Sequence, residues 1–270
     1  MAQESSGARR VLITGAGSGL GRALALRYAR GGDRVACADL DVPRSESTRA
    51  LLPGSGHLAL AADVGDDAAM EDLHAQLERE WGGIDVLVNN AGIASGGAMV
   101  ETTMAEWRRI LEVDLLSVVR GCRLFLPGML AQRSGQVLST ASFAGLAGVP
   151  GLMSYGTAKA AVVALSEQLR AEVEPRGVRV SVICPSFFRT NLCASGIGNP
   201  ATMSLALHLM DTAPDTVDSV ADRVHAQAEA GRFMIIPTRD EPMRWRIKRW
   251  FPALYYRMLK RKFAQLSAPR

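Results

Sequence analysis

The sequence has few cysteines and no long apolar run, and these two absences exclude several classes of protein. No stretch reaches the roughly eighteen apolar residues that cross a bilayer, so we expect no membrane-spanning helix. The polar segment 1–10 lacks the apolar core of a secretory signal. The four cysteines, at 37, 122, 184 and 193, show no metal-ligand or redox spacing. We interpret them as buried small apolar residues in a reducing cytoplasmic compartment and expect no metal site.

Charge is distributed unevenly along the chain. The net charge is +4, but residues 239–270 contain ten Lys and Arg and only two acidic residues, a local charge of +8. The remaining residues, 1–238, therefore sum to −4. A mildly acidic body argues against a nucleic-acid partner and makes the basic C-terminal segment a separate question.

Short apolar runs alternate with longer helical patterns, and this order predicts the fold. The short runs are almost continuously apolar, which is typical of strands covered on both faces in a parallel sheet. We predict an α/β protein with a doubly wound parallel sheet (Rossmann fold) in one domain, 1–238, followed by a helical extension, 239–270. The expected strands are 10–14, 34–39, 57–61, 84–88, 136–140, 178–183 and 232–236, and the expected helices are 19–30, 66–80, 103–126, 153–174 and 215–230.

A glycine-rich segment, 14–21, follows the first expected strand and opens the first expected helix. Glycine tolerates the positive φ angles of a tight turn and lets backbone N–H groups approach a ligand closely. The N-terminus of the helix adds free N–H groups and partial positive charge. This context predicts a dinucleotide pyrophosphate site, with a purely structural turn as the alternative.

Asp39 ends the second expected strand, 18 residues after Gly21. This is close to the spacing of about 20 residues at which an acidic residue meets the adenosine ribose of NAD. Its carboxylate would repel a 2′-phosphate, Ser18 is neutral, and no Lys or Arg directly follows Asp39. NAD is therefore favoured, although NADP is not excluded. Asp41 competes for the role, and a helix N-cap or turn is the structural alternative for Asp39.

Tyr155 and Lys159 lie four residues apart in a helical stretch, 154–169, which places both on one helix face. An ammonium group one turn away lowers the pKa of a phenol from its usual value of about 10, so the phenol can exchange a proton with an alcohol or carbonyl oxygen. Ser142 follows the fifth expected strand, where its hydroxyl could hold that oxygen. A core Tyr with a snorkelling Lys is the alternative.

Taken together, these motifs resemble the short-chain dehydrogenase/reductase family. The resemblance covers about residues 8–238 and includes Asp63-Val64, Asn89 to Gly92, Tyr155 to Lys159, and Pro185 to Thr190. It implies an NAD(P)-dependent oxidoreductase that acts on an alcohol or carbonyl compound. It also implies a homodimer or homotetramer assembled through the helices 103–126 and 153–174.

The resemblance also assigns roles to single positions. It implies that Tyr155 is the general acid and base, that Lys159 lowers its pKa and binds the nicotinamide ribose, and that Ser142 orients the substrate oxygen. The implied cofactor contacts are Gly15, Ser18, Gly19 and Leu20 at the pyrophosphate, Asp39 at the ribose, Asp63 and Val64 at the adenine, Asn90 and Gly92 beside the cofactor, and Pro185, Phe188 and Thr190 at the nicotinamide.

Two positions depart from the family pattern. Asp114 stands where the family usually has the Asn that links the catalytic Lys to solvent through a water. It keeps acceptor oxygens but adds charge and loses an amide donor, so it either serves the same relay with a shifted pH profile or impairs it. Ser186 replaces a usual Gly and changes how the following loop closes.

The segment 190–214 is rich in apolar residues and corresponds in the family to a lid over the substrate. It predicts a lipophilic ligand, with packing against the sheet as an equal alternative. His208 is interpreted as a solvated loop side chain. The apolar residues are Leu192, Ile197, Met203, Leu205, Leu207, Leu209 and Met210.

The C-terminal segment 239–270 predicts a basic amphipathic helix that Pro252 kinks or divides. Such a helix is typical of contact with a membrane surface. The alternatives are a helix that folds over the substrate cleft or one that packs on a partner subunit. Its apolar stripe is Met243, Ile247, Trp250, Phe251, Leu254, Tyr255, Met258 and Leu259.

The sequence therefore favours an NAD-linked oxidoreductase for lipophilic alcohols or carbonyl compounds. An NADP-preferring carbonyl reductase is the first alternative. A non-catalytic dinucleotide-sensing protein is the second, and the intact set of Ser142, Tyr155 and Lys159 argues against it.

Overall fold

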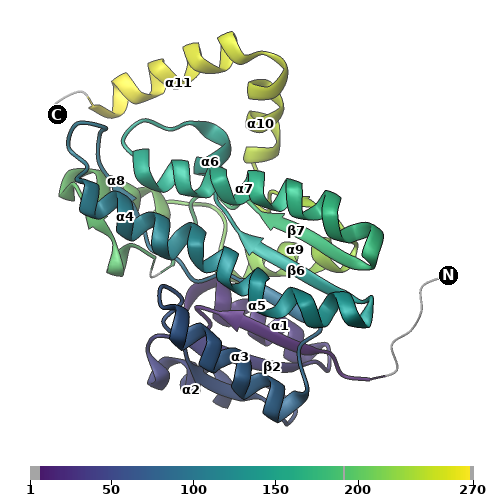
Figure 1. Ribbon diagram of the computed structural model, residues 1–270. Coiled ribbons are helices and arrows are strands. Elements are labelled where there is room, and N and C mark those ends of the chain that lie inside the picture. The colour runs from purple at the N-terminus through teal and green to yellow at the C-terminus, as the bar shows by residue number, and fades with distance from the viewer. Residues whose placement is uncertain (1–6, 191, 268–270) are drawn as a thin grey trace.

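The computed structural model describes residues 7–190 and 192–267, and a parallel seven-stranded sheet forms its centre (Figure 1). Its strands are β1 (Arg10–Thr14), β2 (Arg34–Asp39), β3 (Leu58–Ala61), β4 (Val86–Asn89), β6 (Gly135–Thr140), β7 (Val178–Ile183) and β9 (Met234–Ile235). They lie in the order β3-β2-β1-β4-β6-β7-β9, and every neighbouring pair is parallel. The chain therefore reverses its direction of winding between β1 and β4, which is where such sheets bind ligands.

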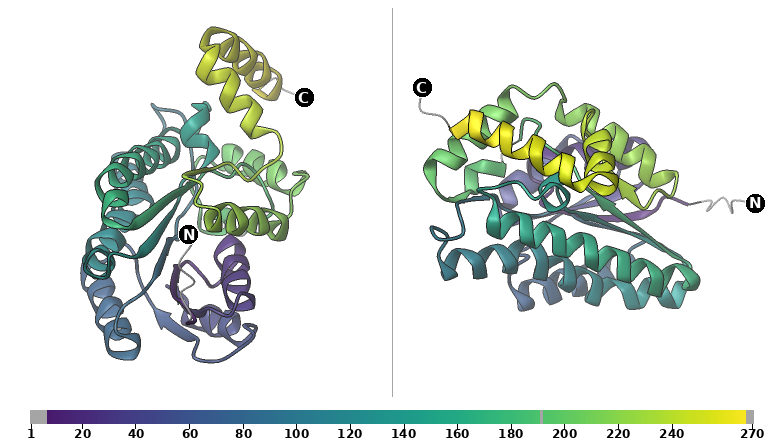
Figure 2. Two further views of the ribbon diagram at one scale, coloured as in Figure 1. Left: turned by 90° about the vertical axis from the view of Figure 1, so that its right-hand side faces the viewer. Right: turned by 90° about the horizontal axis from the view of Figure 1, so that it is seen from above.

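Helices cover both faces of this sheet (Figure 2). On one face α1 (Gly19–Arg30) packs beside α9 (Val217–Glu229). On the other lie α3 (Asp67–Trp81), α5 (Ser117–Gln132) and α7 (Met153–Val173). The predicted doubly wound α/β fold is confirmed, and the observed bounds of four of the five predicted helices agree with the expected ones to within two residues.

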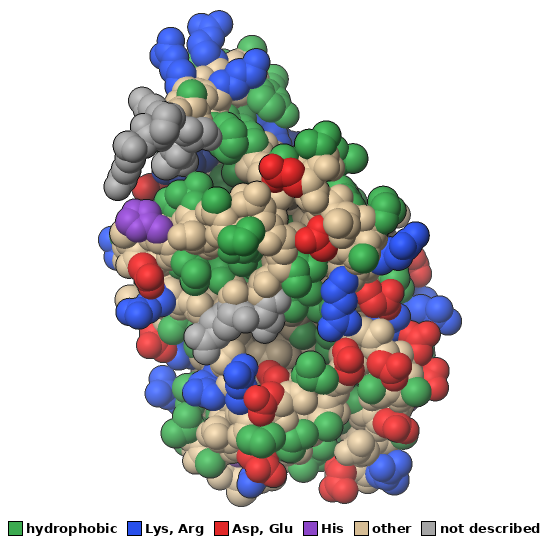
Figure 3. All heavy atoms as spheres, turned by 90° about the vertical axis from the view of Figure 1, so that its left-hand side faces the viewer, with side chains coloured by type: hydrophobic (Ala, Val, Ile, Leu, Met, Phe, Trp, Pro, Cys, Tyr) green, Lys and Arg blue, Asp and Glu red, His purple; other side chains and the backbone are tan. Residues whose placement is uncertain are grey.

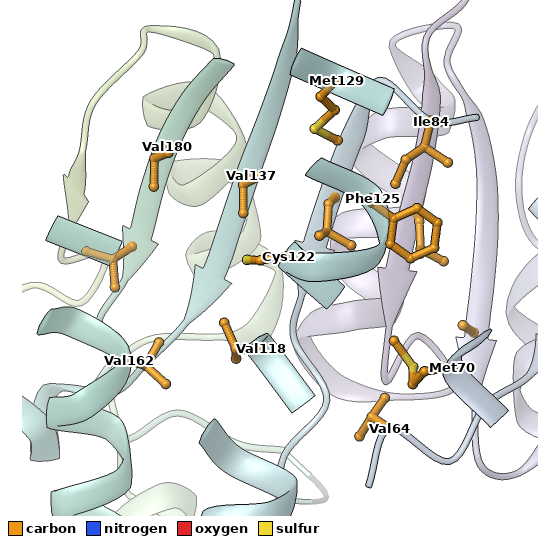
Figure 4. Close-up of a cluster of buried hydrophobic side chains, with 14 of the residues drawn as sticks. Val64, Met70, Ile84, Val118, Cys122, Phe125, Met129, Val137, Val162 and Val180 are labelled. Carbon is orange, nitrogen blue, oxygen red and sulfur yellow. The ribbon is translucent and has the colours of Figure 1, made fainter. Parts of the chain in front are cut away.

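A core of buried apolar side chains joins each helical layer to the sheet. Figure 4 shows the cluster on the α5 side, where Phe125 and Met129 of α5 and Met70 of α3 lie against strand residues such as Val137. Burying each such large side chain stabilises the fold by about 1.5–3 kcal/mol. This packing on both faces explains why the strands are continuously apolar in sequence.

The predicted helix 103–126 is in fact three consecutive segments. These are α4 (Met104–Leu111), a π-helical turn, η1 (Glu112–Leu116), and α5. The prediction of a single uninterrupted helix was therefore wrong, because hydrophobic periodicity does not distinguish a π turn from the α-helix around it. The π turn contains Asp114, and such turns occur frequently at functional sites.

A helix that the hydrophobic pattern did not indicate, α2 (Val42–Ala50), follows β2. Its residues are mostly polar, and only Ser45 and Thr48 of its side chains are buried. Its N-terminus is set by Asp41, whose side chain accepts a hydrogen bond from the backbone N–H of Arg44 at 3.2 Å, and by Pro43 in the first turn.

Two regions after β7 lie outside the sheet: in Figure 1 the segment with α8 is at the left, and the C-terminal extension is at the top. The segment after Thr190 contains a short 3₁₀ turn, η3 (Leu192–Ser195), the strand β8 (Ile197–Gly198), which pairs with β5 (Ser95–Gly96), and α8 (Pro200–Asp211). The C-terminal extension forms α10 (Glu241–Trp250) and α11 (Pro252–Ser267). The predicted division at Pro252 is confirmed. Within the described ranges no helix has both the length and the apolarity needed to cross a bilayer.

Candidate active site

A cleft of about 490 Å³ opens where β1, β2, β4, β6 and β7 end. This volume lies within the usual range for small-molecule sites, about 300–1,000 Å³. Except for Asp114, every residue predicted from the sequence to act in catalysis or cofactor binding lines this cleft. They are Gly15, Ser18, Gly19, Leu20, Asp39, Asp63, Val64, Asn90, Gly92, Ser142, Tyr155, Lys159, Pro185, Phe188 and Thr190.

The glycine-rich turn between β1 and α1 leaves no room for a side chain at Gly15, Gly17 or Gly21. Gly15 and Gly19 have φ angles of 64° and 51°, in the left-handed region that favours glycine. A Cβ on Gly21 would lie 2.2 Å from the carbonyl oxygen of Gly15. The N-cap Ser18 makes no side-chain hydrogen bond to α1, so the N–H groups of the first turn face the cleft without a side-chain partner within the described part of the chain. This arrangement suits an anionic group such as a pyrophosphate.

The carboxylate of Asp39 is fixed at the edge of this turn. One of its oxygens accepts a hydrogen bond from the backbone N–H of Gly17 at 2.8 Å, and the other accepts one from the N–H of Asp41 at 3.0 Å. Asp41 is the N-cap of α2 and forms a 3.0 Å ion pair with Arg44. The capping role considered for Asp39 therefore belongs to Asp41, which leaves Asp39 facing the cleft.

A partly buried hydrogen-bond network ties the ends of β1, β4 and β6 together. The hydroxyl of Thr14 accepts hydrogen bonds from the backbone N–H groups of Asn90 and Ala91 at 3.0 and 3.1 Å. The side-chain amide of Asn90 donates to the Thr14 carbonyl at 3.0 Å, and its oxygen accepts from the hydroxyl of Thr140 at 3.3 Å. These contacts make the floor of the cleft rigid, and the carboxylate of Asp63 at its far end accepts a hydrogen bond from the N–H of Gly65 at 2.9 Å.

Ser142 is both a cleft residue and the N-cap of a short helix, α6 (Phe143–Ala147). Its hydroxyl oxygen accepts a hydrogen bond from the N–H of Ala144 at 3.1 Å and lies 3.4 Å from the Pro185 carbonyl, to which it donates. The position of the Ser142 hydroxyl therefore depends on α6 being formed.

Tyr155 and Lys159 lie on the cleft side of α7, as their spacing predicted. The Nζ atom of Lys159 is 5.8 Å from the centre of the Tyr155 ring and donates a hydrogen bond to the Thr140 carbonyl at 3.1 Å. Burial raises the pKa of the Tyr155 phenol and the negative charge of Asp114 raises it further, while a hydrogen bond with Ser142 lowers it. The spacing of Tyr155 and Lys159 predicted that Lys159 lowers the pKa of the Tyr155 phenol. In this structure the pKa of the phenol is raised, which is the opposite direction.

Asp114 lies behind the cleft and is fully buried. One carboxylate oxygen accepts a hydrogen bond from the N–H of Ile93 at 2.8 Å. The other lies 3.5 Å from Nζ of Lys159 and accepts no hydrogen bond from any described residue. Burial raises the pKa of Asp114, and the charge of Lys159 opposes that shift. The ammonium group of Lys159, which the spacing predicted to act on Tyr155, thus forms an ion pair with Asp114.

The remaining walls of the cleft are mostly apolar. Phe143 and Val149 come from α6 and the loop that follows it, Leu152 precedes α7, and Met203 and Met210 come from α8. Part of segment 190–214 therefore lines the ligand space, which is one of its two interpretations from the sequence. Leu207 of the same segment points to solvent. His208 is exposed, as predicted, but it lies on α8 and not in a loop.

Two expectations from the sequence need correction at this site. Cys37, Cys122 and Cys184 are buried free thiols as predicted, but Cys193 is only half-buried and lines the cleft. Arg44, which sequence reasoning missed, also lines the cleft beside Asp39. The sequence Asp41-Val42-Pro43, an N-cap followed by a proline in the first turn, is the feature that could have revealed α2 and so the position of Arg44.

Comparisons with known proteins bear on the family and the fold of this chain. A sequence profile described as short chain dehydrogenase matches residues 9–198. The chain is 38% identical over 182 residues to meso-2,3-butanediol dehydrogenase of Serratia marcescens, which spans 67% of this chain and 72% of that enzyme.

Two solved structures are similar over nearly their full length. A short chain dehydrogenase/reductase from Burkholderia phymatum in complex with NAD has a TM-score of 0.84 at 27% identity, over 92% of this chain and 95% of that one. A short-chain dehydrogenase from Sphingobium yanoikuyae in complex with NADPH has a TM-score of 0.75 at 26% identity, over 97% and 96% of the two chains.

Proposed function

Because this chain belongs to the short-chain dehydrogenase/reductase family and is an NAD(P)-dependent oxidoreductase acting on alcohols or carbonyl compounds, we propose that it prefers NAD(H) and a lipophilic substrate. The observation that carries this proposal is the composition of the cleft. The Asp39 carboxylate lies at one end, Ser142, Tyr155 and Lys159 lie in the middle, and apolar side chains line the other end.

The residues present fit a dinucleotide. The glycine turn, in which a side chain at Gly21 would collide with backbone, leaves space and free N–H groups for a pyrophosphate. We assign Gly15, Ser18, Gly19 and Leu20 to the pyrophosphate, Asp39 to the adenosine ribose, and Asp63 and Val64 to the adenine. Asn90 and Gly92 would lie beside the cofactor, Lys159 would bind the nicotinamide ribose, and Pro185, Phe188 and Thr190 would contact the nicotinamide. When bound, this cofactor accepts or supplies a hydride at its nicotinamide ring.

We assign the proton transfer to Tyr155. In alcohol oxidation its phenolate accepts the hydroxyl proton, and in carbonyl reduction its phenol donates a proton to the carbonyl oxygen. Ser142 would hold the same oxygen by a hydrogen bond, because its hydroxyl lies at the cleft surface. Lys159 contributes positive charge beside the phenol, 5.8 Å from the ring centre.

Asp114 acts on this set through charge. When ionised, it pairs with Lys159 at 3.5 Å and raises the pKa of Tyr155, which disfavours the phenolate. When protonated, it is close in shape to an asparagine, and the positive charge of Lys159 is no longer offset. We therefore propose that Asp114 shifts the pH profile of the reaction to higher pH and does not abolish the activity.

The preference for NAD(H) follows from one fixed group at the ribose end, the carboxylate of Asp39. The Asp39 carboxylate, held by two backbone N–H groups, accepts hydrogen bonds from ribose hydroxyls and repels a 2′-phosphate. Arg44 lies nearby, but its guanidinium is paired with Asp41. Arg44 is the observation that would favour the alternative, an NADP-preferring reductase.

One kinetic experiment tests the proposed function. Initial rates are measured for water-soluble and long-chain secondary alcohols with NAD⁺ and NADP⁺, and for the matching ketones with NADH and NADPH. We expect a higher kcat/KM with NAD(H) and with the longer chain. A clear preference for NADP(H) would refute the assignment of Asp39. Tight NADH binding without turnover of any substrate would instead support the non-catalytic alternative.

Two further statements are proposals about partners. We propose a homodimer or homotetramer assembled through α4, α5 and α7, on the strength of family resemblance. We also propose that the extension 239–270, of which residues 239–267 are described, is a separate functional element that contacts a membrane surface from the cytoplasm. Its charge and amphipathic pattern support this.

A further inference from the structure

The C-terminal extension packs directly on the outside of the cleft wall. Tyr255 of α11 is buried in an apolar cluster with Phe143 and Ala147 of α6, and Val149, Trp245 and Leu259 pack around it. Phe143 and Val149 also line the cleft. A single layer of side chains therefore separates the extension from the substrate space.

Two polar contacts fix the extension to the end of α6. The ammonium of Lys248 donates a hydrogen bond to the Leu146 carbonyl, and the Tyr255 hydroxyl donates to the Ala147 carbonyl at 3.0 Å. The last carbonyls of a helix lack partners within the helix and need outside donors. A helix as short as α6 is unstable alone, so these donors, about a hundred residues away in sequence, help to keep it formed. Ser142 is the N-cap at its other end.

The outer side of the extension exposes large apolar groups. Trp250 and Phe251, at the corner between α10 and α11, are 72% and 63% exposed, and Leu254 and Met258, one turn apart on α11, are 48% and 49% exposed. We call these four residues the outer strip. Figure 1 shows the two helices meeting at this corner above α6.

The charges around the outer strip have one sign. After Glu241 the sequence contains no acidic residue, and Arg249, Arg257 and Arg261 lie close to the strip in sequence. Figure 3 shows Lys and Arg side chains gathered at the end of the extension, with hydrophobic side chains beside them. Exposed aromatic and aliphatic groups bordered by cations fit an interface of anionic lipid headgroups, where each cation near the surface adds about 1 kcal/mol. Two extensions do not pair with each other through this surface, because both are basic.

We propose that the outer strip docks on an anionic lipid surface while Lys248 and Tyr255 hold α6, so that the extension joins the bilayer to the substrate wall. The inference rests on the proposed function and deepens it: the substrate is an alcohol or carbonyl compound dissolved in the membrane. Docking places the extension between the bilayer and the α6 wall, which contains Phe143 and lies beside Val149. Tyr255 and Lys248 are positioning residues that act through α6 on Ser142.

The test uses the full chain with NAD⁺ and vesicles of phosphatidylcholine alone or mixed equally with phosphatidylglycerol. Three variants are compared with the parent: an outer-strip variant, Trp250→Ser with Phe251→Ser; a matched control with two exposed apolar residues changed elsewhere, Leu51→Ser with Val100→Ser; and Tyr255→Phe. The measurements are co-sedimentation, turnover of isopropanol and of a vesicle-borne secondary dodecanol, and NADH affinity.

We expect the parent and the matched control to bind phosphatidylglycerol vesicles at least about tenfold more tightly than neutral ones. The outer-strip variant should lose this binding and the turnover of the vesicle-borne alcohol, and keep that of isopropanol. Tyr255→Phe should bind vesicles normally and lower kcat/KM for both alcohols severalfold, with unchanged NADH affinity.

Equal binding of the parent to both vesicles, or unaltered binding by the outer-strip variant, would overturn the lipid contact. A variant that changes only the oligomeric state would identify the strip as a subunit interface and would also overturn it. An unchanged kcat/KM in Tyr255→Phe would overturn the role of the extension at α6. Normal vesicle binding by a parent that turns over no alcohol would refute the proposed function and leave the lipid contact standing.

Discussion

The two ends of the cleft are built in different ways. The end assigned to the dinucleotide is made of backbone: glycines at positive φ, the N-terminus of α1, and the hydrogen bonds of Thr14 and Asn90. The end assigned to the substrate is made of side chains from α6 and α8. An added carbon atom at Gly15 or Gly21 has no space at the first end, whereas a changed side chain at the second end alters only the shape and polarity of the cleft. Substitutions at the dinucleotide end should therefore cause loss of cofactor binding or activity, whereas substitutions at the substrate end should change the substrate preference.

Tyr155→Phe, where the two ends meet, should have the largest effect. Removing the hydroxyl removes the group that moves the proton, and general acid–base catalysis contributes about 10²–10⁴-fold to rate. We expect kcat to fall by about 10³-fold, with NADH affinity nearly unchanged, as measured by steady-state rates and by fluorescence titration.

Tyr28→Phe is the matched control. Tyr28 is fully buried in α1, and its hydroxyl has no hydrogen-bond partner among the described residues. Its removal should leave kcat unchanged and should not lower the thermal stability. A Tyr155→Phe variant as active as the parent would show that the proton is transferred by another group.

Gly21→Ala tests the claim that the dinucleotide end has no space. The added Cβ would lie 2.2 Å from the Gly15 carbonyl oxygen and 2.7 Å from the amide nitrogen of Asn90, so the turn must shift. We expect a loss of about 1–3 kcal/mol in the free energy of unfolding and a weakening of NADH binding, both measurable by titration.

Gly128→Ala is its control, because nothing lies within 4 Å of the added Cβ on α5. An alanine in a helix is favoured over glycine by about 1 kcal/mol, so this variant should gain stability. Equal behaviour of the two variants would mean that the glycine turn adapts to a side chain, and the contrast between the two ends would fail.

Asp114→Asn tests how charge acts at Tyr155, where the two ends of the cleft meet. The ionised carboxylate raises the pKa of Tyr155, so its neutral replacement should move the phenol pKa, and with it the rising limb of alcohol oxidation, to lower pH. Oxidation at neutral pH should be severalfold faster than in the parent. At acid pH, where Asp114 is itself protonated, the two profiles should converge. Superimposable profiles of kcat against pH would show that Asp114 carries no charge that Tyr155 senses.

The sequence predicted the backbone-built end well because backbone demands leave clear patterns. The glycines of 14–21, the sheet and the position of Asp39 follow from φ angles, apolar strands and a fixed spacing, and all are found in the structure. The side-chain-built end was predicted less completely. Apolar residues such as Met203 and Leu207 look alike in sequence, yet one lines the cleft and the other points to solvent.

The charge interactions at the site could not be predicted from the sequence either. The spacing of Tyr155 and Lys159 places them on one helix face but does not show that Asp114, from another segment, pairs with the ammonium. Burial, which decides the direction of the Tyr155 pKa, depends on contacts from several elements at once. Arg44 was missed for a related reason, because the mostly polar α2 has almost no apolar face.

Met203→Thr should change only the preference between substrates, and it tests the substrate end alone. Met203 lies on α8 at the cleft wall, and a shorter, polar side chain there removes apolar contact surface without touching the glycine turn. One lost methylene contact in an apolar pocket is worth about 1–3 kcal/mol, so kcat/KM for a long-chain alcohol should fall about tenfold relative to isopropanol. Met104→Thr, at an exposed methionine on α4 that does not line the cleft, is the matched control. If Met203→Thr weakened NADH binding as much as it weakened alcohol turnover, the two ends of the cleft would not be separable.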